Sequence, residues 1–196
     1  MPALEGTGRK KGVKGSSGVG RLARLVCPDL CCPSIGDIDL AALKRCGIEG
    51  LIVDVDNTLV EWNRHEPTEA LHTWFDAVRA AGLRCCIVSN SRRRDGIAAF
   101  AKPLGVPFVV PAGKPSPRPF RLAMNLLGTD PSNTAVVGDQ VLTDVLGGNA
   151  LGLYTVLVKP IGTREFAGTR LVRRFERMIL RYLRRRGLIP EDPPTV

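Results

Sequence analysis

The sequence has few aromatic residues and no long apolar run, and both shortages exclude classes of protein. The longest mostly apolar stretch, residues 151–158, is far shorter than the roughly 20 residues that a membrane-spanning helix needs. Aromatic residues make up 5% of the 196 residues, and no RNA- or DNA-binding motif is recognisable, so we expect no specific nucleic-acid partner. The basic N-terminus lacks the apolar segment of a secretion signal. We therefore expect a protein on the cytoplasmic or organelle-matrix side, not a secreted one.

Histidine is scarce, and the cysteines do not have the spacing of a metal site. The two histidines, His65 and His72, have no evident partners and receive no role. The cysteines are Cys27, Cys31, Cys32, Cys46, Cys85 and Cys86. Without paired C-x2-C spacings or nearby histidines, we expect no zinc. Two adjacent cysteine pairs also argue against a disulfide framework, and we expect Cys85 and Cys86 to be small core residues.

The formal net charge of +9 is concentrated at the two ends of the chain. Residues 1–24 carry six basic residues against Glu5, and residues 164–186 carry nine arginines against Glu165 and Glu176. We therefore expect a flexible basic arm over 1–24, a folded domain over 25–163, a basic amphipathic helix over 164–186 and a tail over 187–196. Basic extensions on a near-neutral body favour an anionic surface as partner.

Strand and helix patterns alternate through the middle of the chain. A first helix is expected over residues 38–46. Strands are expected at residues 51–53, 83–88, 106–110, 134–137 and 153–158, and helices at 68–81, 93–104, 117–127 and 141–150. This alternation predicts an α/β fold with a doubly wound parallel sheet, whose ligands bind beyond the carboxyl ends of the strands.

The polar residues that follow the expected strands form a candidate site. They are Asp54, Asp56 and Thr58 after the first strand, Ser89 and Asn90 after the second, Lys114 before a later helix, and Asp139 and Asp144 after the fourth strand. Carboxylates gathered in one crevice repel one another unless a cation lies among them. A hard divalent ion with oxygen ligands, Mg²⁺, meets that need, and such a site suits phosphoryl transfer. Asp144 has a simpler alternative, because an acid in the first turn of a helix is favoured by the helix dipole alone.

The sequence has D-x-D-x-T after the first strand, a serine after the second, a lysine before a later helix and G-D-x4-D after the fourth strand. In this order over residues 51–144, these four motifs resemble those of the haloacid dehalogenase (HAD) superfamily of phosphatases. The resemblance implies that Asp54 is the nucleophile that becomes an aspartyl-phosphate and that Asp56 is the general acid and base. It also implies a phosphate-binding set and a metal-binding set. The first comprises Thr58, Ser89, Asn90 and Lys114, and the second comprises Asp54, the backbone carbonyl of Asp56, Asp139 and Asp144.

The segments LVCPDL, SIGDIDLAALKRCGIEGLIVDVDNTLV, IVSNS and VVGDQVLTDVLGGNALGLYTVLVKPI look like the YqeG-like HAD phosphatases of subclass IIIA. This resemblance covers roughly residues 25–183, and the cysteines of CPDLCC depart from it. It implies a Mg²⁺-dependent phosphatase related to enzymes that convert phosphatidylglycerophosphate into phosphatidylglycerol. The short distances between motifs leave room for little or no cap domain, so the crevice should be open to a surface-bound phosphate.

The segment over residues 164–186 has apolar residues at helical spacing and arginines around them. The apolar residues are Leu171, Val172, Phe175, Met178, Ile179, Tyr182 and Leu183. One interpretation is a helix that lies on an anionic membrane and makes the protein a peripheral membrane protein. The other is that the apolar stripe packs on the sheet, with the arginines in solvent.

Three further interpretations stay open. Arg92, Arg93 and Arg94 begin a helix near the phosphate site, and they either bind a second phosphate or form an ordinary charged helix start. The substrate is either phosphatidylglycerophosphate or a soluble sugar phosphate or nucleotide. A third possibility, from another class, is a basic nucleic-acid-binding protein built on a HAD scaffold.

Overall fold

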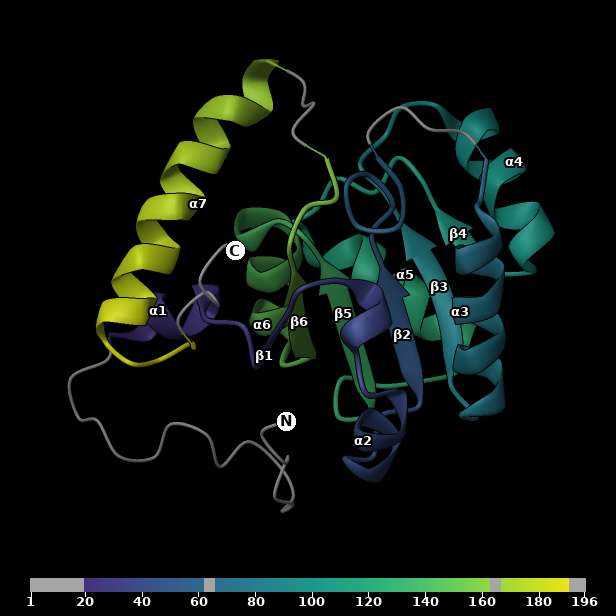
Figure 1. Cartoon of the computed structure of the whole chain (residues 1–196), viewed down its shortest axis with the longest axis horizontal. Helices are drawn as coiled ribbons and strands as arrows, with labels where there is room; N and C mark the ends of the chain where they lie inside the picture. Colours follow the sequence, from purple (N-terminus) through teal and green to yellow (C-terminus); the bar gives the residue numbers. More distant parts are fainter. Residues whose placement is uncertain (1–19, 62–65, 163–166, 191–196) are drawn as a thin grey trace.

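Short apolar, largely β-branched segments form the central sheet of the protein. The computed structural model describes residues 20–61, 66–162 and 167–190. Six strands pair in the order β1-β6-β5-β2-β3-β4, and every pairing is parallel. The strands are β1 (Leu30–Cys32), β2 (Gly50–Val53), β3 (Arg84–Val88), β4 (Phe108–Val109), β5 (Thr134–Gly138) and β6 (Tyr154–Val158). The expected α/β class with a parallel sheet is confirmed (Figure 1).

The helices begin and end at the residues that local chemistry favours. They are α1 (Arg21–Val26), α2 (Leu40–Arg45), α3 (Glu69–Ala80), α4 (Arg94–Leu104), α5 (Pro117–Leu127), α6 (Leu146–Leu151) and α7 (Ala167–Arg185). The hydroxyl of Thr68 accepts a hydrogen bond from the N–H of Leu71 at 3.3 Å and caps α3. Gly105 and Gly128 end α4 and α5 in the left-handed conformation, which glycine adopts without steric cost.

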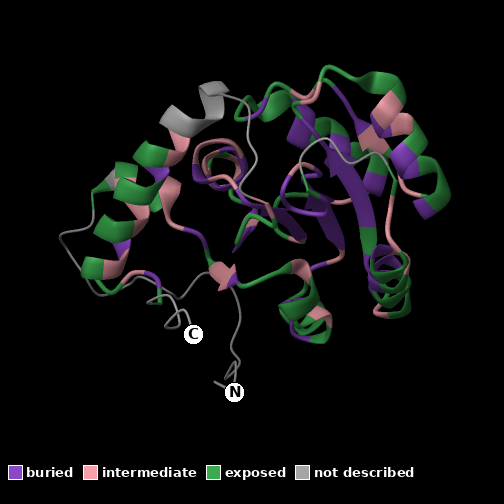
Figure 2. Cartoon of the chain, turned by 45° about the horizontal axis from the view of Figure 1, so that its top comes forward, coloured by how far each residue is buried: buried purple, intermediate pink, exposed green. Residues whose placement is uncertain are grey.

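Alternate residues of each strand point to opposite faces and pack against different helices. On one face, Leu51 and Val53 lie in a core cluster with side chains of α2, α3 and α4. On the other face, Ile52 packs with Val136 and with Phe120 of α5. The central strands are therefore buried on both faces, whereas the outer sides of the helices are exposed (Figure 2).

The direction of the chain across the sheet changes at β2, and this change positions the site. From β2 the chain passes through α3 to β3 and then through α4 to β4 at one edge. It then returns through α5 to β5, on the other side of β2, and continues through α6 to β6. Ligands of open parallel sheets bind beyond the carboxyl ends of the strands at such a switch point. The residues that follow β2 and β5 occupy this position.

The structure differs from the sequence-based expectations in three places. The sequence pattern did not indicate β1, which pairs with β6 at the sheet edge. Helix α1 begins at Arg21, so residues 21–24 of the expected arm are helical, while residues 1–19 lie outside the described residues. The expected helix over 141–150 begins as a π-helical segment, Val141–Val145, before it continues as α6. The expected cap-free arrangement is confirmed between Ser89 and Lys114, where the chain holds only α4 and β4.

Helix α7 lies beside the β1–β6 edge of the sheet, with α1 near its C-terminal end (Figure 1). Glu176 and Leu183 are buried, and Ile179 and Leu180 pack against the cluster that contains Val141 and Leu157. Phe175, Met178 and Tyr182 are exposed. The buried face is thus rotated by roughly a quarter turn from the apolar stripe, so only part of the stripe packs against the protein. Membrane binding by the exposed part stays a prediction. Among the described helices, none is both long and apolar enough to cross a bilayer.

Candidate functional site

A tight loop after β2 brings Asp54 and Thr58 into the interior. The N–H of Asp54 donates to the carbonyl oxygen of Val137 at 3.0 Å, which fixes the end of β2 against β5. The loop then turns back at Asn57, whose φ of 60° lies in the left-handed region that asparagine tolerates. Asp54 and Thr58 are buried, and Asp56 is half-buried between them. The loop therefore directs one carboxyl and one hydroxyl into the switch point.

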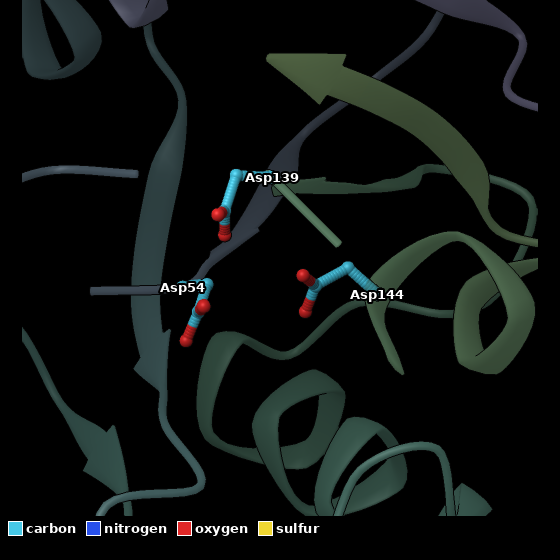
Figure 3. A group of neighbouring side chains, drawn as sticks. All are labelled: Asp54, Asp139 and Asp144. Atoms are coloured by element: carbon cyan, nitrogen blue, oxygen red, sulfur yellow. The ribbon is translucent and has the colours of Figure 1, made fainter. Parts of the chain in front are cut away.

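Three buried carboxyl groups meet at this point. Asp54, Asp139 and Asp144 each offer an oxygen atom, and these atoms all lie within 4.8 Å of one another (Figure 3). Asp54 follows β2, Asp139 follows β5, and Asp144 lies in the π-helical segment. A Cβ atom on Gly138 would lie 2.3 Å from the carboxyl carbon of Asp144, so this close approach requires glycine. The structure thus brings together three acids that the sequence analysis placed in one site, and their metal-binding role stays a prediction.

Lys114 is the cation of the cluster. Its Nζ lies 2.8 Å from Oδ1 of Asp54 and 2.7 Å from Oδ1 of Asp144, and its side chain is only 3% exposed. Burial alone would lower the pKa of Lys114, but the two carboxylates outweigh this effect and raise the pKa above its usual range. The two carboxylates therefore favour the charged form of Lys114.

Asn90 and Ser89 reach the site in different ways. Oδ1 of Asn90 accepts from the N–H of Lys114 at 2.7 Å, and its Nδ2 donates to the carbonyl oxygen of Lys114 at 3.2 Å. Asn90 thus positions Lys114, and its expected contact with phosphate stays a prediction. Ser89 is fully buried at the end of β3, where its hydroxyl oxygen accepts from the N–H of Ser91 at 3.1 Å.

Two acids of the cluster, Asp139 and Asp144, have raised pKa values. Burial, and then the nearby charge of Asp54, raise the pKa of Asp139. Burial also raises the pKa of Asp144, with Lys114 partly opposing the shift and Asp54 adding to it. The hydroxyl of Thr58 donates to Oδ1 of Asp139 at 3.0 Å. Such a group of oxygen ligands favours a hard divalent cation, which suppresses the repulsion between the acids.

Two residues of α7, Arg173 and Glu176, lie at the edge of the site, and the sequence pattern indicated neither of them. Arg173 pairs with the carboxylate of Asp139, and its Nη1 donates to the carbonyl oxygen of Asp139 at 2.6 Å. Glu176 is buried, accepts from the N–H of Leu142 at 2.9 Å and lies 3.2 Å from Nη1 of Arg173. A weak signal existed, because Glu176 is a solitary acid among the arginines of this helix.

Arg92, Arg93 and Arg94, at the beginning of α4, are exposed. Nη1 of Arg94 donates to the carbonyl oxygen of Val110 at 3.1 Å, and its guanidinium lies 5.8 Å from the centre of the Phe108 ring. Arg94 therefore supports the β4 edge. Binding of a second phosphate by Arg92 and Arg93 stays a prediction.

Comparison with known proteins places this geometry in a family. The HAD-hydrolase-like family model matches residues 111–165. The probable phosphatase YqeG of Bacillus subtilis is 40% identical over 168 residues, which are 86% of this chain and 97% of that protein.

Two phosphatidylglycerophosphate phosphatases are more distant. The chloroplastic protein of Chlamydomonas reinhardtii is 33% identical over 78% of this chain, and the chloroplastic/mitochondrial protein of Arabidopsis thaliana is 29% identical over 88%. This chain matches 60% and 52% of their respective lengths. The acid cluster and its lysine lie at the switch point of a parallel sheet, and the likeness to the Bacillus protein extends over nearly its full length. The chain therefore belongs to the YqeG-like family of HAD-type phosphatases.

Proposed function

We propose that the protein is a Mg²⁺-dependent phosphomonoester hydrolase that works through an aspartyl-phosphate on Asp54. The observation that carries this proposal is the buried group of Asp54, Asp139, Asp144 and Lys114. The three acids carry three negative charges when ionised, and Lys114 and Arg173 offset two of them. A divalent cation makes the site net positive, as the binding of a phosphate dianion requires.

The donor set fits Mg²⁺, because three buried carboxyl groups offer oxygen atoms to one point. Asp54, Asp139 and Asp144 would hold the ion, together with the backbone carbonyl of Asp56 that the family resemblance implies. When bound, the ion neutralises phosphate oxygens and supports the developing charge.

The chain's own residues perform the two displacement steps. A carboxylate oxygen of Asp54 forms a bond with phosphorus while the ester P–O bond breaks, and Asp56 gives its proton to the leaving oxygen. Asp56, now ionised, then takes a proton from water as the water oxygen attacks phosphorus and releases Asp54. Lys114, Thr58 and Ser89 are proposed to bind the phosphate oxygens during both steps.

The proposed substrate is phosphatidylglycerophosphate at a membrane surface. The names of the Chlamydomonas and Arabidopsis relatives support this choice. Phe175, Met178 and Tyr182 lie at i, i+3 and i+7 on α7, and all three are about half exposed. Two exposed arginines, Arg174 and Arg185, flank this face. An apolar face with basic flanks suits the surface of an anionic bilayer, so we propose a peripherally bound enzyme.

The test is phosphate release from phosphatidylglycerophosphate in mixed vesicles with Mg²⁺. Wild type is compared with Asp54→Asn, and both are also given a soluble aryl phosphate. We expect vesicle activity that exceeds the aryl phosphate rate and disappears in Asp54→Asn. Activity on the aryl phosphate alone would support the catalytic residues but direct the search to soluble phosphate esters. Full activity of Asp54→Asn would overturn the mechanism.

A further inference from the structure

A cavity of about 760 Å³ lies between α7 and the β1–β6 edge of the sheet. Asp139 lines it, so the cavity reaches the catalytic cluster. Its volume lies in the range of pockets that enclose a small organic ligand, and it is much larger than a phosphate group needs. The proposed reaction at Asp54 does not use this cavity.

The wall of the cavity on the sheet side is largely apolar. Leu157 and Val158 of β6 line it together with Cys31 of β1, and Leu180 of α7 faces them across the cavity. Leu157 and Val158 are buried, and Leu180 is half-buried. A surface of this kind binds hydrocarbon better than the hydroxyl groups of a sugar, because it offers few hydrogen-bonding partners.

The helix side of the same cavity carries positive charge. Arg177 and Arg181 lie one turn apart on α7, and both line the cavity. Within the described part of the chain, no carboxylate forms an ion pair with either of them. The nearby acid Glu176 instead accepts from the N–H of Leu142 and pairs with Arg173. The cavity thus joins an apolar wall to two cations that have no anionic partner among the described residues.

We propose that this cavity binds the non-reacting part of a phosphorylated lipid. Arg177 and Arg181 bind the phosphodiester, and the glycerol backbone and first acyl carbons lie against Leu157 and Leu180. The lipid therefore lies between α7 and the sheet, on the side of the helix opposite Phe175 and Met178. This assignment rests on the proposed lipid phosphatase activity and identifies the residues that select a lipid over a soluble ester.

The experiment uses a substrate that needs no membrane. The full chain is given dihexanoyl phosphatidylglycerophosphate below its micelle concentration and, separately, p-nitrophenyl phosphate, and the ratio of the two kcat/KM values is measured. Two variants change the cavity: Arg177→Gln with Arg181→Gln removes its cations, and Leu180→Trp fills it. The matched control, Lys102→Gln with Arg121→Gln, removes two exposed positive charges from α4 and α5. Circular dichroism checks that each variant is folded.

We expect the ratio to fall about tenfold or more in both cavity variants, mainly through KM for the lipid, and to change less than about twofold in the control. The arginine variant changes exposed side chains, so it tests the proposal even where Leu180→Trp fails to fold. If the wild type hydrolyses the lipid and the cavity variants keep the wild-type ratio of the two kcat/KM values, the cavity assignment is overturned and the proposed function stands. A wild type that hydrolyses only the aryl phosphate would overturn both the cavity assignment and the proposed lipid substrate, and it would leave the phosphatase activity supported.

Discussion

Arg173 joins helix α7 to the acid cluster of Asp54, Asp139 and Asp144 through Asp139. Its guanidinium pairs with the carboxylate of Asp139 and donates to the carbonyl oxygen of the same residue at 2.6 Å. Glu176 completes the connection by accepting from the N–H of Leu142. Helix α7 is therefore held to the site by polar contacts as well as by apolar packing.

Replacing Arg173 by methionine should destabilise the protein. The change leaves the buried carboxyl groups of Asp139 and Glu176 without their guanidinium partner, so we expect the free energy of unfolding to fall by about 3 kcal/mol. Urea unfolding followed by circular dichroism measures this. The neighbouring Arg174 is exposed, and Arg174→Met should change the free energy by no more than about 0.5 kcal/mol. Equal effects of the two substitutions would show that the Arg173 contacts are not stabilising.

Replacing Gly138 by alanine should displace Asp144. The added Cβ would lie 2.3 Å from the carboxyl carbon of Asp144, so that side chain must move away from Asp54 and Lys114. We expect kcat for p-nitrophenyl phosphate to fall by about tenfold or more. Gly36→Ala is the control, because its Cβ would meet only Oγ of Ser34 at 3.6 Å. If Gly138→Ala keeps the wild-type kcat, Asp144 does not take part in catalysis.

The exposed apolar face of α7 should determine binding to vesicles. We expect Phe175→Ser, Met178→Ser and Tyr182→Ser together to weaken binding to phosphatidylglycerol-containing vesicles by at least about tenfold, because three half-exposed side chains lose their burial in lipid. Co-sedimentation measures the bound fraction, with pure phosphatidylcholine vesicles as the uncharged reference. Leu122→Ser with Leu126→Ser removes similarly exposed side chains from α5 and should leave binding unchanged. Equal loss in both variants would assign the effect to general surface hydrophobicity.

Mg²⁺ should stabilise the protein more at pH 8 than at pH 5. Burial raises the pKa of Asp139 to about 7 and that of Asp144 to about 6, from an ordinary value of 3.8. Because the pKa values of Asp139 and Asp144 are raised in the folded state, folding favours their protonated forms. Their contribution to the free energy of unfolding of the metal-free protein is therefore fully present below about pH 4, and it is lost as the pH rises through 6 and 7.

Mg²⁺ binds the ionised carboxylates, so protons compete with it at low pH. At a concentration 100 times its Kd, the ion adds about 2.7 kcal/mol to the free energy of unfolding. Thermal unfolding with and without Mg²⁺ at the two pH values measures the difference, with Asp139→Asn as the control. A rise in Tm that is equal at both pH values would argue against binding at these acids.

Much of the fold and most of the acid cluster were predictable from local pattern. Continuous apolar runs such as that of β2 indicate strands buried on both faces, and polar residues that follow parallel strands must meet at one edge of the sheet. Strand β1 escaped prediction because it has only three residues and receives its hydrogen bonds from β6. Its pairing is a long-range property that three residues do not encode locally.

The part of α7 in the site could not be predicted for a different reason. Helical periodicity identifies an apolar stripe, but it does not say which part of the stripe is buried. The burial of Glu176 and the exposure of Phe175 depend on where the helix lies against the π-helical segment and β6. The roles of Arg173 and Glu176 are therefore consequences of tertiary packing.

The β1–β6 edge has helix α1 and the arginine-rich helix α7 on the same side of the molecule. Nδ2 of Asn149 donates to the carbonyl oxygens of Leu25 and Cys27 and holds the end of α1 there, and α7 lies along the same edge. The near-neutral sheet and its other helices extend away from it. The exposed arginines of α7 give this side of the described molecule a positive potential, so we expect a negatively charged surface to attract this edge first. Added salt should slow the approach by screening this attraction.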